Sequence, residues 1–271
     1  MGYIGSKGTH LSHQSNVDQP FRSAATAPNF PVPYPGWSTI NYIGFNINSI
    51  YNAASFTFRR RFVHNFFYRA SYTYAKSIDE GSIFLGAAPQ DPRNMRLERG
   101  RSDFDVGHTF TMAFSWEAPR HTNILLRGWQ LAGTGIGRTG LPFTLTVSNV
   151  NVNLGQATRP NRVAKGTAPA PTPQQWYDVS AFPQVPTGAY AFGASGRNIL
   201  DGPGLLTLNV SFSRSFAVRE KGRLQFRWEA FNFINRVNFG QPVVTVNTPN
   251  AATITTAAAA RSMQVGLRYS F

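Results

Sequence analysis

The segment MQVGLRYSF, residues 263–271, indicates the fold class of this protein more directly than any other. Its odd positions, from Met263 to Phe271, carry apolar side chains, whereas its even positions carry Gln, Gly, Arg and Ser. Successive side chains of a β-strand point to opposite faces of the sheet, so the stretch predicts a strand with one apolar face and one polar face. A tilted strand of about 9 to 11 residues is long enough to cross a bilayer.

The same period of two recurs upstream, and its polar face indicates the surroundings. Four stretches show it clearly: residues 66–76, 106–116, 206–213 and 223–229. A soluble β-sandwich also alternates, but its outer face meets bulk water. Here the polar positions are mostly Ser, Thr, Gly, Asn and Arg, as in an enclosed lumen. Trp116, Trp129 and Tyr269 stand near strand ends, where membrane barrels carry aromatic girdles. The pattern predicts an all-β, antiparallel transmembrane β-barrel.

The connections between the predicted strands alternate between short and long. Short ones cover residues 63–65, 119–128 and 218–222, and long ones cover about 9–48, 78–105, 148–203 and 234–260. A barrel with tight periplasmic turns and long extracellular loops requires this alternation. Because the long connections are rich in Pro, Gly, Asn and Ala, we expect irregular surface loops. We expect the low-complexity tract at 250–260 to be mobile.

Composition excludes several other classes. Only 14% of the 271 residues are charged, against roughly 25% in soluble domains, and 14% are aromatic. No apolar run reaches about 18 residues, which excludes a helical membrane protein. The absence of Cys excludes a disulfide framework and thiolate metal sites. The net charge of +14 is dispersed, with Arg59–Arg61 the only run of three, so we expect no nucleic-acid binding.

The end of the chain resembles the terminal signal of outer-membrane barrels. That signal has a polar residue, a Gly two positions later, and aromatic residues at two alternate positions with Phe last. The matching residues are Gln264, Gly266, Tyr269 and Phe271. The resemblance implies location in the bacterial outer membrane, contact with its lipid and lipopolysaccharide, and recognition by the barrel-assembly machinery. A free edge strand can be bound by β-augmentation, which gives this recognition a physical basis.

Longer motifs resemble the Oar-like group of TonB-dependent receptors. They include YIGSKGTHL from Tyr3, SYTYAKSID from Ser71, PQDPRNMRLERGRSDFDVGHTF from Pro89, GWQLAGTGIGRTGLPFTLT from Gly128, GRNILDGPG from Gly196 and LQFRWEAFNFINRVNFG from Leu224. The resemblance implies that residues 1–271 are the C-terminal part of a larger barrel of about 22 strands. About eight strands would lie here, with the plug and the N-terminal domain absent, so the TonB complex would be reached only through the missing plug. The first residues contain no signal peptide, so we expect the true start to lie upstream if the protein is exported.

Two functional hypotheses remain open. The leading one is a receptor-transporter barrel fragment whose parent takes up a bulky nutrient recognised by the long loops. The alternative is a complete small barrel of eight strands that acts in adhesion or envelope anchoring, since eight strands can close around a side-chain-filled interior. An enzyme is not expected, because no Ser-His-Asp or Cys-His arrangement is visible, and we expect no cofactor.

The densest polar cluster lies in the second long connection. It comprises Asp91, Arg93, Asn94, Arg96, Glu98, Arg99, Arg101, Asp103 and Asp105. The cluster could bind an anionic or glycan ligand, or hold Ca²⁺ through Asp103, Asp105 and Glu98. The favoured interpretation is a loop held above the barrel rim by its own Arg–carboxylate pairs, because the carboxylates lack the regular spacing of a Ca²⁺ loop.

Charged residues at polar strand positions form a second candidate set, facing the lumen. Its members are Arg69, Arg138, Arg227, Glu229 and Arg268. They could meet the plug or a ligand, although a lumen network of ion pairs is the simpler account. His10 and His13 alone are too few for a metal site. The Gly-rich stretch at 133–140 lacks the Lys-Ser/Thr ending of a phosphate loop, so we interpret its glycines as relief of crowding in a strand.

Overall fold

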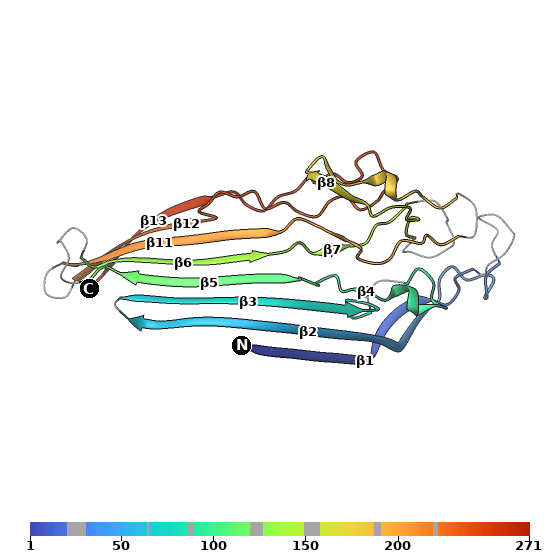
Figure 1. Cartoon of the computed structure of the whole chain (residues 1–271), viewed down its shortest axis with the longest axis horizontal. Coiled ribbons are helices and arrows are strands. Elements are labelled where there is room, and N and C mark those ends of the chain that lie inside the picture. Colours follow the sequence, from blue (N-terminus) through green and yellow to red (C-terminus); the bar gives the residue numbers. More distant parts are fainter. Residues whose placement is uncertain are drawn as a thin grey trace.

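A computed structural model describes residues 1–20, 31–63, 65–85, 89–119, 127–148, 158–186, 191–218 and 222–271. Within them, eight long strands form one antiparallel sheet in the order β1-β2-β3-β5-β6-β11-β12-β13 (Figure 1). The long strands are β1 (Gly2–Asn16), β2 (Asn41–Val63), β3 (Phe66–Asp79), β5 (His108–Glu117), β6 (Trp129–Arg138), β11 (Leu205–Val218), β12 (Gly222–Phe231) and β13 (Ser262–Ser270). Each long strand pairs with the next one along the chain, which confirms the predicted antiparallel β fold.

Short elements belong to the connections. They are β4 (Gly100–Arg101), β7 (Pro142–Phe143), β8 (Thr167–Thr172), β9 (Gln175–Tyr177), β10 (Leu200–Asp201) and the 3-10 helices Met95–Glu98 and Val179–Ala181. β4 pairs with β3, β7 with β10, and β8 with β9. The two helices in the described part of the chain are short 3-10 turns, and neither could span a bilayer.

The strand registers align the apolar side chains into continuous rows across the sheet. One row runs through six strands, from β13 to β3: Val265, Trp228, Phe212, Leu131, Trp116 and Phe66. These rows stay exposed rather than covered by a second sheet, with Val265 65% and Leu267 70% accessible. The apolar face is therefore convex and bare, as a lipid-facing surface should be.

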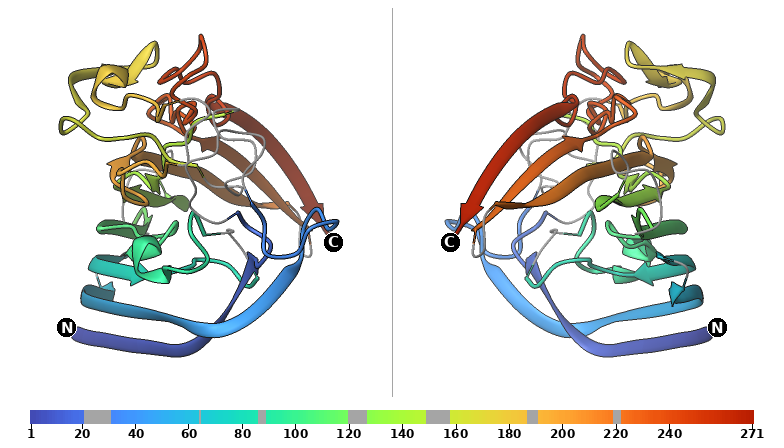
Figure 2. Two further views of the ribbon diagram at one scale, coloured as in Figure 1. Left: turned by 90° about the vertical axis from the view of Figure 1, so that its right-hand side faces the viewer. Right: turned by 90° about the vertical axis from the view of Figure 1, so that its left-hand side faces the viewer.

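The opposite face is concave and polar. A representative row reads Arg59, Arg69, Ala113, Thr134 and Asn209 from β2 to β11. Hydroxyl groups pair across it, as in the 3.0 Å hydrogen bond between Thr57 and Ser71. Seen end-on, the sheet curls around this face (Figure 2). Two stacked sheets with the Phe and Tyr rows buried between them would have contradicted the prediction, and the described strands are not arranged in that way.

The sheet is curved but not closed. Among the described residues, the outer edges of β1 and β13 pair with no further strand. The described parts of the long connections, 17–40, 80–107, 139–204 and 232–261, lie at one end, and the strand ends that border the short connections lie at the other (Figure 1). This confirms the predicted alternation, although residues 64, 120–126 and 219–221 of the short turns lie outside the described part.

The long connections contain a hydrophobic core of their own. Leu145 and Tyr177 are fully buried there, together with Phe143, Val147, Ala181, Phe182, Val185, Leu200, Val246 and Ala252. The Tyr177 hydroxyl donates to the Val243 carbonyl at 2.9 Å, and burial raises the pKa of Tyr177 to about 12. The expectation of irregular surface loops was therefore wrong for the connections β6–β11 and β12–β13, which pack against each other.

The tract at 250–260, which the sequence predicts to be mobile, makes backbone hydrogen bonds to neighbouring segments. The Ala252 carbonyl accepts from the Trp176 N–H at 2.8 Å, and the Ile254 N–H donates to the Pro173 carbonyl at 2.7 Å. Ala252 is buried. The small Ala and Thr side chains let this backbone approach its neighbours closely enough for hydrogen bonding, so low complexity here accompanies packing.

Candidate functional site

The end of the sheet where the long connections lie is called the loop mouth. A buried network of ion pairs holds these connections in place there. Glu98 ends the 3-10 helix and is buried against Arg159 of the β6–β11 connection. Arg159 Nη2 lies 3.0 Å from Glu98 Oε1, and its Nη1 lies 3.3 Å from Oε2. Glu98 also accepts from the Gln90 N–H at 2.9 Å. The pair joins two connections that are far apart in sequence.

Arg197 makes a second buried junction. Its guanidinium forms an ion pair with Asp79 at the end of β3, and Nη2 also donates to the Asp79 carbonyl at 2.9 Å. Its Nε donates to the Glu98 carbonyl at 2.9 Å, and its Nη1 lies 3.5 Å from Asp103. One side chain thus links the sheet to two connections.

Asp105 is the third junction. It accepts from Arg101 Nε at 2.7 Å, from the Ser77 N–H at 2.7 Å and from Lys76 Nζ at 3.0 Å. Desolvation is the largest single effect on the pKa of Asp105 and acts to raise it. The three donors together outweigh it and hold the pKa below its ordinary value. Arg101 also pairs with Asp201 at 2.7 Å.

The nine residues of the polar cluster bind partly to one another and partly to residues outside the cluster. Arg101 and Asp105 pair within the cluster, and the Arg93 N–H donates to Asp91 at 2.9 Å. The other partners come from outside, because Arg99 lies 4.0 Å from Glu80 and Arg93 donates to the Pro20 carbonyl at 3.1 Å. Arg96 and Asn94 are exposed.

Two residues that the sequence pattern did not predict, Arg159 and Arg197, bind the cluster's carboxylates Glu98 and Asp103. The cluster has equal numbers of Asp/Glu and Arg residues, so its composition gave no sign of partners elsewhere. The only available signal was the motif GRNILDGPG, which contains Arg197. Among the described residues, no group of three or more His, Asp or Glu side chains is arranged to hold a metal ion. The carboxylates considered as Ca²⁺ ligands form ion pairs with Arg and Lys side chains instead.

The second candidate set lies on the concave face, as the strand registers show for all five residues: Arg69, Arg138, Arg227, Glu229 and Arg268. Arg227 Nε is 3.3 Å from Glu229 Oε1, and Glu229 also accepts from the Gln264 amide. The registers bring Arg227 and Arg268 onto neighbouring strands but leave Arg69 and Arg138 on other strands. A role for these residues in binding stays a prediction.

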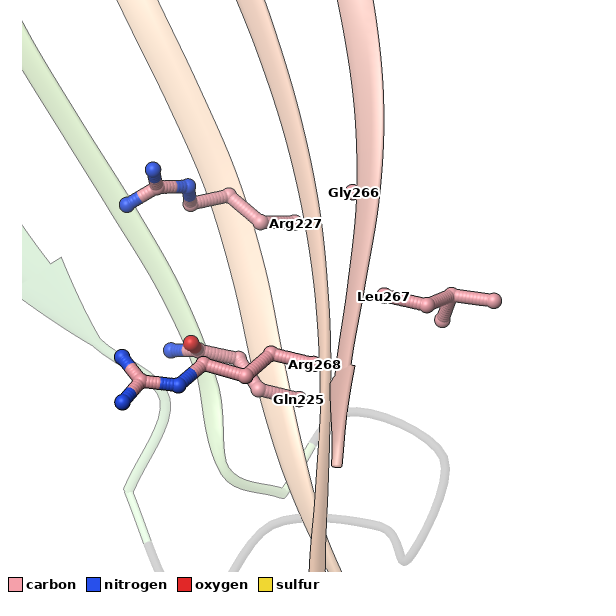
Figure 3. A pocket seen from close by; sticks show the side chains of 5 residues that line it. All are labelled: Gln225, Arg227, Gly266, Leu267 and Arg268. Carbon is pink, nitrogen blue, oxygen red and sulfur yellow. The ribbon is translucent and has the colours of Figure 1, made fainter. Parts of the chain in front are cut away.

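A pocket of about 150 Å³ opens beside Arg227 and Arg268 near the short-turn end of the sheet (Figure 3). Gly266 lies opposite Arg227 in the register, and no atom lies within 4 Å of the point where its Cβ would be. The side chains of Arg227, Arg268 and Gln225 project to one side of the strands, and Leu267 projects to the other (Figure 3). The concave face here offers two guanidinium groups with open space between them.

The residues of the terminal signal are divided between both faces of β13. Gln264 and Gly266 share the concave face, and Tyr269 lies on the convex face opposite Leu224. Phe271 follows the strand, and its ring stacks on Tyr269 at a centroid distance of 5.8 Å. One edge of β13 pairs with β12, and the other pairs with no described strand.

Aromatic rings gather on the convex face towards the short-turn end. Trp129 stacks on Phe212 at 4.1 Å and meets Phe226 edge-on at 6.0 Å. The Arg214 guanidinium lies over the Phe216 ring at 4.7 Å. Aromatic residues of this kind, with a cation that can reach towards headgroups, are typical of the boundary between hydrocarbon and water.

Comparison with known families agrees with this geometry. Residues 1–264 match a family model described as "Outer membrane beta barrel domain". The chain belongs to this family. A search of curated proteins and a search of solved structures each gave no match. As an outer membrane β-barrel domain, the protein is located in the bacterial outer membrane. A convex apolar face is the kind of surface that such barrels turn towards lipid.

Proposed function

We propose that this outer membrane β-barrel domain is the C-terminal part of a TonB-dependent receptor of the Oar-like group, which takes up a bulky nutrient. The observation that carries the proposal is the open sheet with an ordered loop mouth at one end. The motif resemblance given above supplies the family, and the open sheet supplies the physical argument for a larger barrel.

The free edges favour a barrel with more strands than the eight described long ones. In hydrocarbon, each unsatisfied backbone N–H or C=O group costs several kcal/mol. The edges of β1 and β13 would therefore pair with further strands in the membrane. A closed barrel of about eight strands is filled by its own side chains, whereas barrels of about 22 strands leave a wide lumen. A wide lumen suits the passage of a bulky solute.

The loop mouth has the properties of a recognition surface. Its backbone is fixed by Arg159 and Arg197, while large aromatic side chains of neighbouring connections remain exposed. Trp37 is 70% exposed and Phe84 83% exposed. Rigid loops that present exposed aromatic rings are well suited to bind sugars or partly apolar solutes.

The partners of this function follow from the surfaces. The convex face would contact lipid and, in the outer leaflet, lipopolysaccharide. The free edge of β13, with Tyr269 and Phe271, would be the strand that the barrel-assembly machinery recognises. The TonB complex would act through a plug, which the proposal places in the same protein but not in these strands. We propose no catalytic role and no cofactor.

The test is energised uptake in the source bacterium. Deleting the gene should abolish growth on one bulky nutrient from a panel of oligosaccharides, peptides and metal chelates, and inactivating TonB should abolish growth on the same nutrient. Uptake that continues after the proton-motive force is collapsed would contradict the proposal. So would a deletion strain with unchanged uptake of every nutrient but weaker attachment to surfaces.

A further inference from the structure

A cavity of about 220 Å³ lies at the loop end of the sheet, where β6 ends and β11 begins. Its lining comes from three segments: Arg138 and Leu141 from the end of β6 and beyond, Pro203 and Leu205 from the start of β11, and residues 238–241 of the β12–β13 connection. Arg138 and Leu205 are register partners on the concave face. The cavity therefore faces the path that a solute would take into the lumen.

Hydrogen bonds hold the walls of this rim pocket in place. The Leu141 carbonyl accepts from the Gly202 N–H at 2.9 Å and from the Gln241 amide at 3.2 Å. Asn238 pairs with the Leu206 backbone, accepting at 2.9 Å and donating at 3.1 Å. A Cβ at Gly140 would lie 1.7 Å from the Gly202 carbonyl oxygen, so the two strand ends touch through backbone. The pocket is therefore formed before any ligand arrives.

The chemistry of the lining is asymmetric. Leu141, Pro203, Leu205 and Phe239 provide apolar walls, and Arg138 is the one charged side chain among the lining residues. The amides of Asn238 and Gln241 already bind backbone groups. Within the described part of the chain, the Arg138 guanidinium has no ion pair or hydrogen bond. A guanidinium beside apolar walls is a strong binding site for a carboxylate, because its N–H groups donate to both carboxylate oxygens in a matching fork geometry.

We infer that the rim pocket binds a small carboxylate that carries an apolar body, either free or as one end of a larger nutrient. Ligand pockets usually measure about 300–1,000 Å³, so this cavity takes a single ring or a short chain rather than a whole bulky solute. The role of this pocket in uptake rests on the proposed function. The binding of a carboxylate does not rest on it, because binding can be measured without transport.

The test measures binding of 3-phenylpropionate to the protein purified from the outer membrane of its source bacterium in a neutral detergent. The neutral alcohol 3-phenylpropanol and inorganic phosphate serve as comparison probes. We expect the carboxylate to bind about tenfold or more tightly than the alcohol, because a hydrogen bond to a charged group is lost with the alcohol. Inorganic phosphate alone should bind at least as weakly as the alcohol, since it lacks the apolar body.

Two variants locate the site. Arg138→Gln should weaken carboxylate binding about tenfold or more and leave the alcohol unchanged, whereas the matched control Arg162→Gln, at an exposed arginine outside the pocket lining, should change neither. Equal affinity for acid and alcohol, tight binding of phosphate alone, or equal losses in both variants would overturn the assignment. If Arg138→Gln fails to assemble, two measurements still test the site. The unchanged protein should bind the acid more tightly than the alcohol, and Phe239→Ala should weaken the binding of both. If deleting the gene leaves the uptake of every nutrient unchanged while the purified protein still binds the acid, this site stands and only the proposed transport is contradicted.

Discussion

The sheet and the loop mouth of this protein are stabilised in opposite ways. In the sheet, strands that follow one another in sequence share backbone hydrogen bonds, and the large apolar side chains stay on the exposed convex face. In the loop mouth, buried ion pairs and a small hydrophobic core join segments that are far apart, such as Arg197 and Asp79 at a separation of 118 residues. The lipid is the solvent for the first region, and the protein itself supplies the interior of the second.

The largest effect should come from breaking the Arg197 junction. Arg197→Met leaves the Asp79 carboxylate buried without its partner, which typically costs about 3–5 kcal/mol. In intact cells, we expect the loops of this variant to become sensitive to added protease. The sheet should stay folded, so that the protein still migrates differently on gels before and after heating. Arg162→Met is the control, because Arg162 is exposed and donates only to nearby carbonyls. Unchanged protease resistance in Arg197→Met would contradict the assigned role.

The second effect should appear in the sheet. Val210 lies on the convex face near the middle of β11, opposite Gly133 and Ala230. Val210→Arg should destabilise the barrel by about 2–4 kcal/mol, the cost of a cation facing the bilayer centre. Ser211→Arg, one residue further and on the concave face, should cost much less. The urea midpoints of both variants measure this difference, and equal midpoints would show that the two faces are wrongly assigned.

Acid should loosen the loop mouth before the sheet. The pKa of Asp105 in the folded protein lies below the ordinary value of 3.8, so its stabilisation is complete above that pH. It is lost as the pH falls through the lower folded value. Cleavage by an acid-active protease, followed from about pH 5 down to about pH 2, should rise over this window. Asp105→Asn should be cleaved faster at higher pH and lose the pH dependence, with about 1.5–3 kcal/mol less stability. If Asp105→Asn kept the pH dependence of cleavage seen in the original protein, another carboxyl group would be responsible for it.

The smallest effect should come from Tyr177→Phe. The change removes the hydroxyl that donates to the Val243 carbonyl but keeps the ring in the loop core. A net hydrogen bond contributes about 0.5–1.5 kcal/mol, so the loops should open slightly more often without rearrangement. Hydrogen exchange of the amides around 243–254 would report this opening. Leu145→Ala, which leaves a cavity in the same core, should lower the stability of the loops by about 2–5 kcal/mol and therefore increase amide exchange more than Tyr177→Phe does.

The two regions also differ in what their sequence reveals. The alternation in residues 66–76, 106–116 and 206–213 predicted β3, β5 and β11, because side-chain direction in a strand depends only on local position. The alternation of short and long connections predicted which ends carry the loops. The family match to residues 1–264 agrees with the barrel and leaves the finer TonB-dependent identity as a proposal.

The loop mouth could be predicted only in part. The polar cluster from Asp91 to Asp105 was recognised, but its partners Arg159 and Arg197 were not, since pairing across 61 or more residues leaves no local pattern. The loop core was missed because its members, such as Phe143 and Tyr177, lie in short strands of two or three residues. The tract at 250–260 was predicted to be mobile because small residues that permit close backbone packing also occur in linkers.

The backbone contact between Gly140 and Gly202 has a consequence for how this chain can change over evolution. Any other residue at Gly140 would place its Cβ 1.7 Å from a carbonyl oxygen that belongs to the neighbouring segment. Natural variants should therefore keep glycine at position 140, whatever happens to the walls around it. The loops around these segments can diversify in sequence, but the spacing between the two backbones is inherited unchanged.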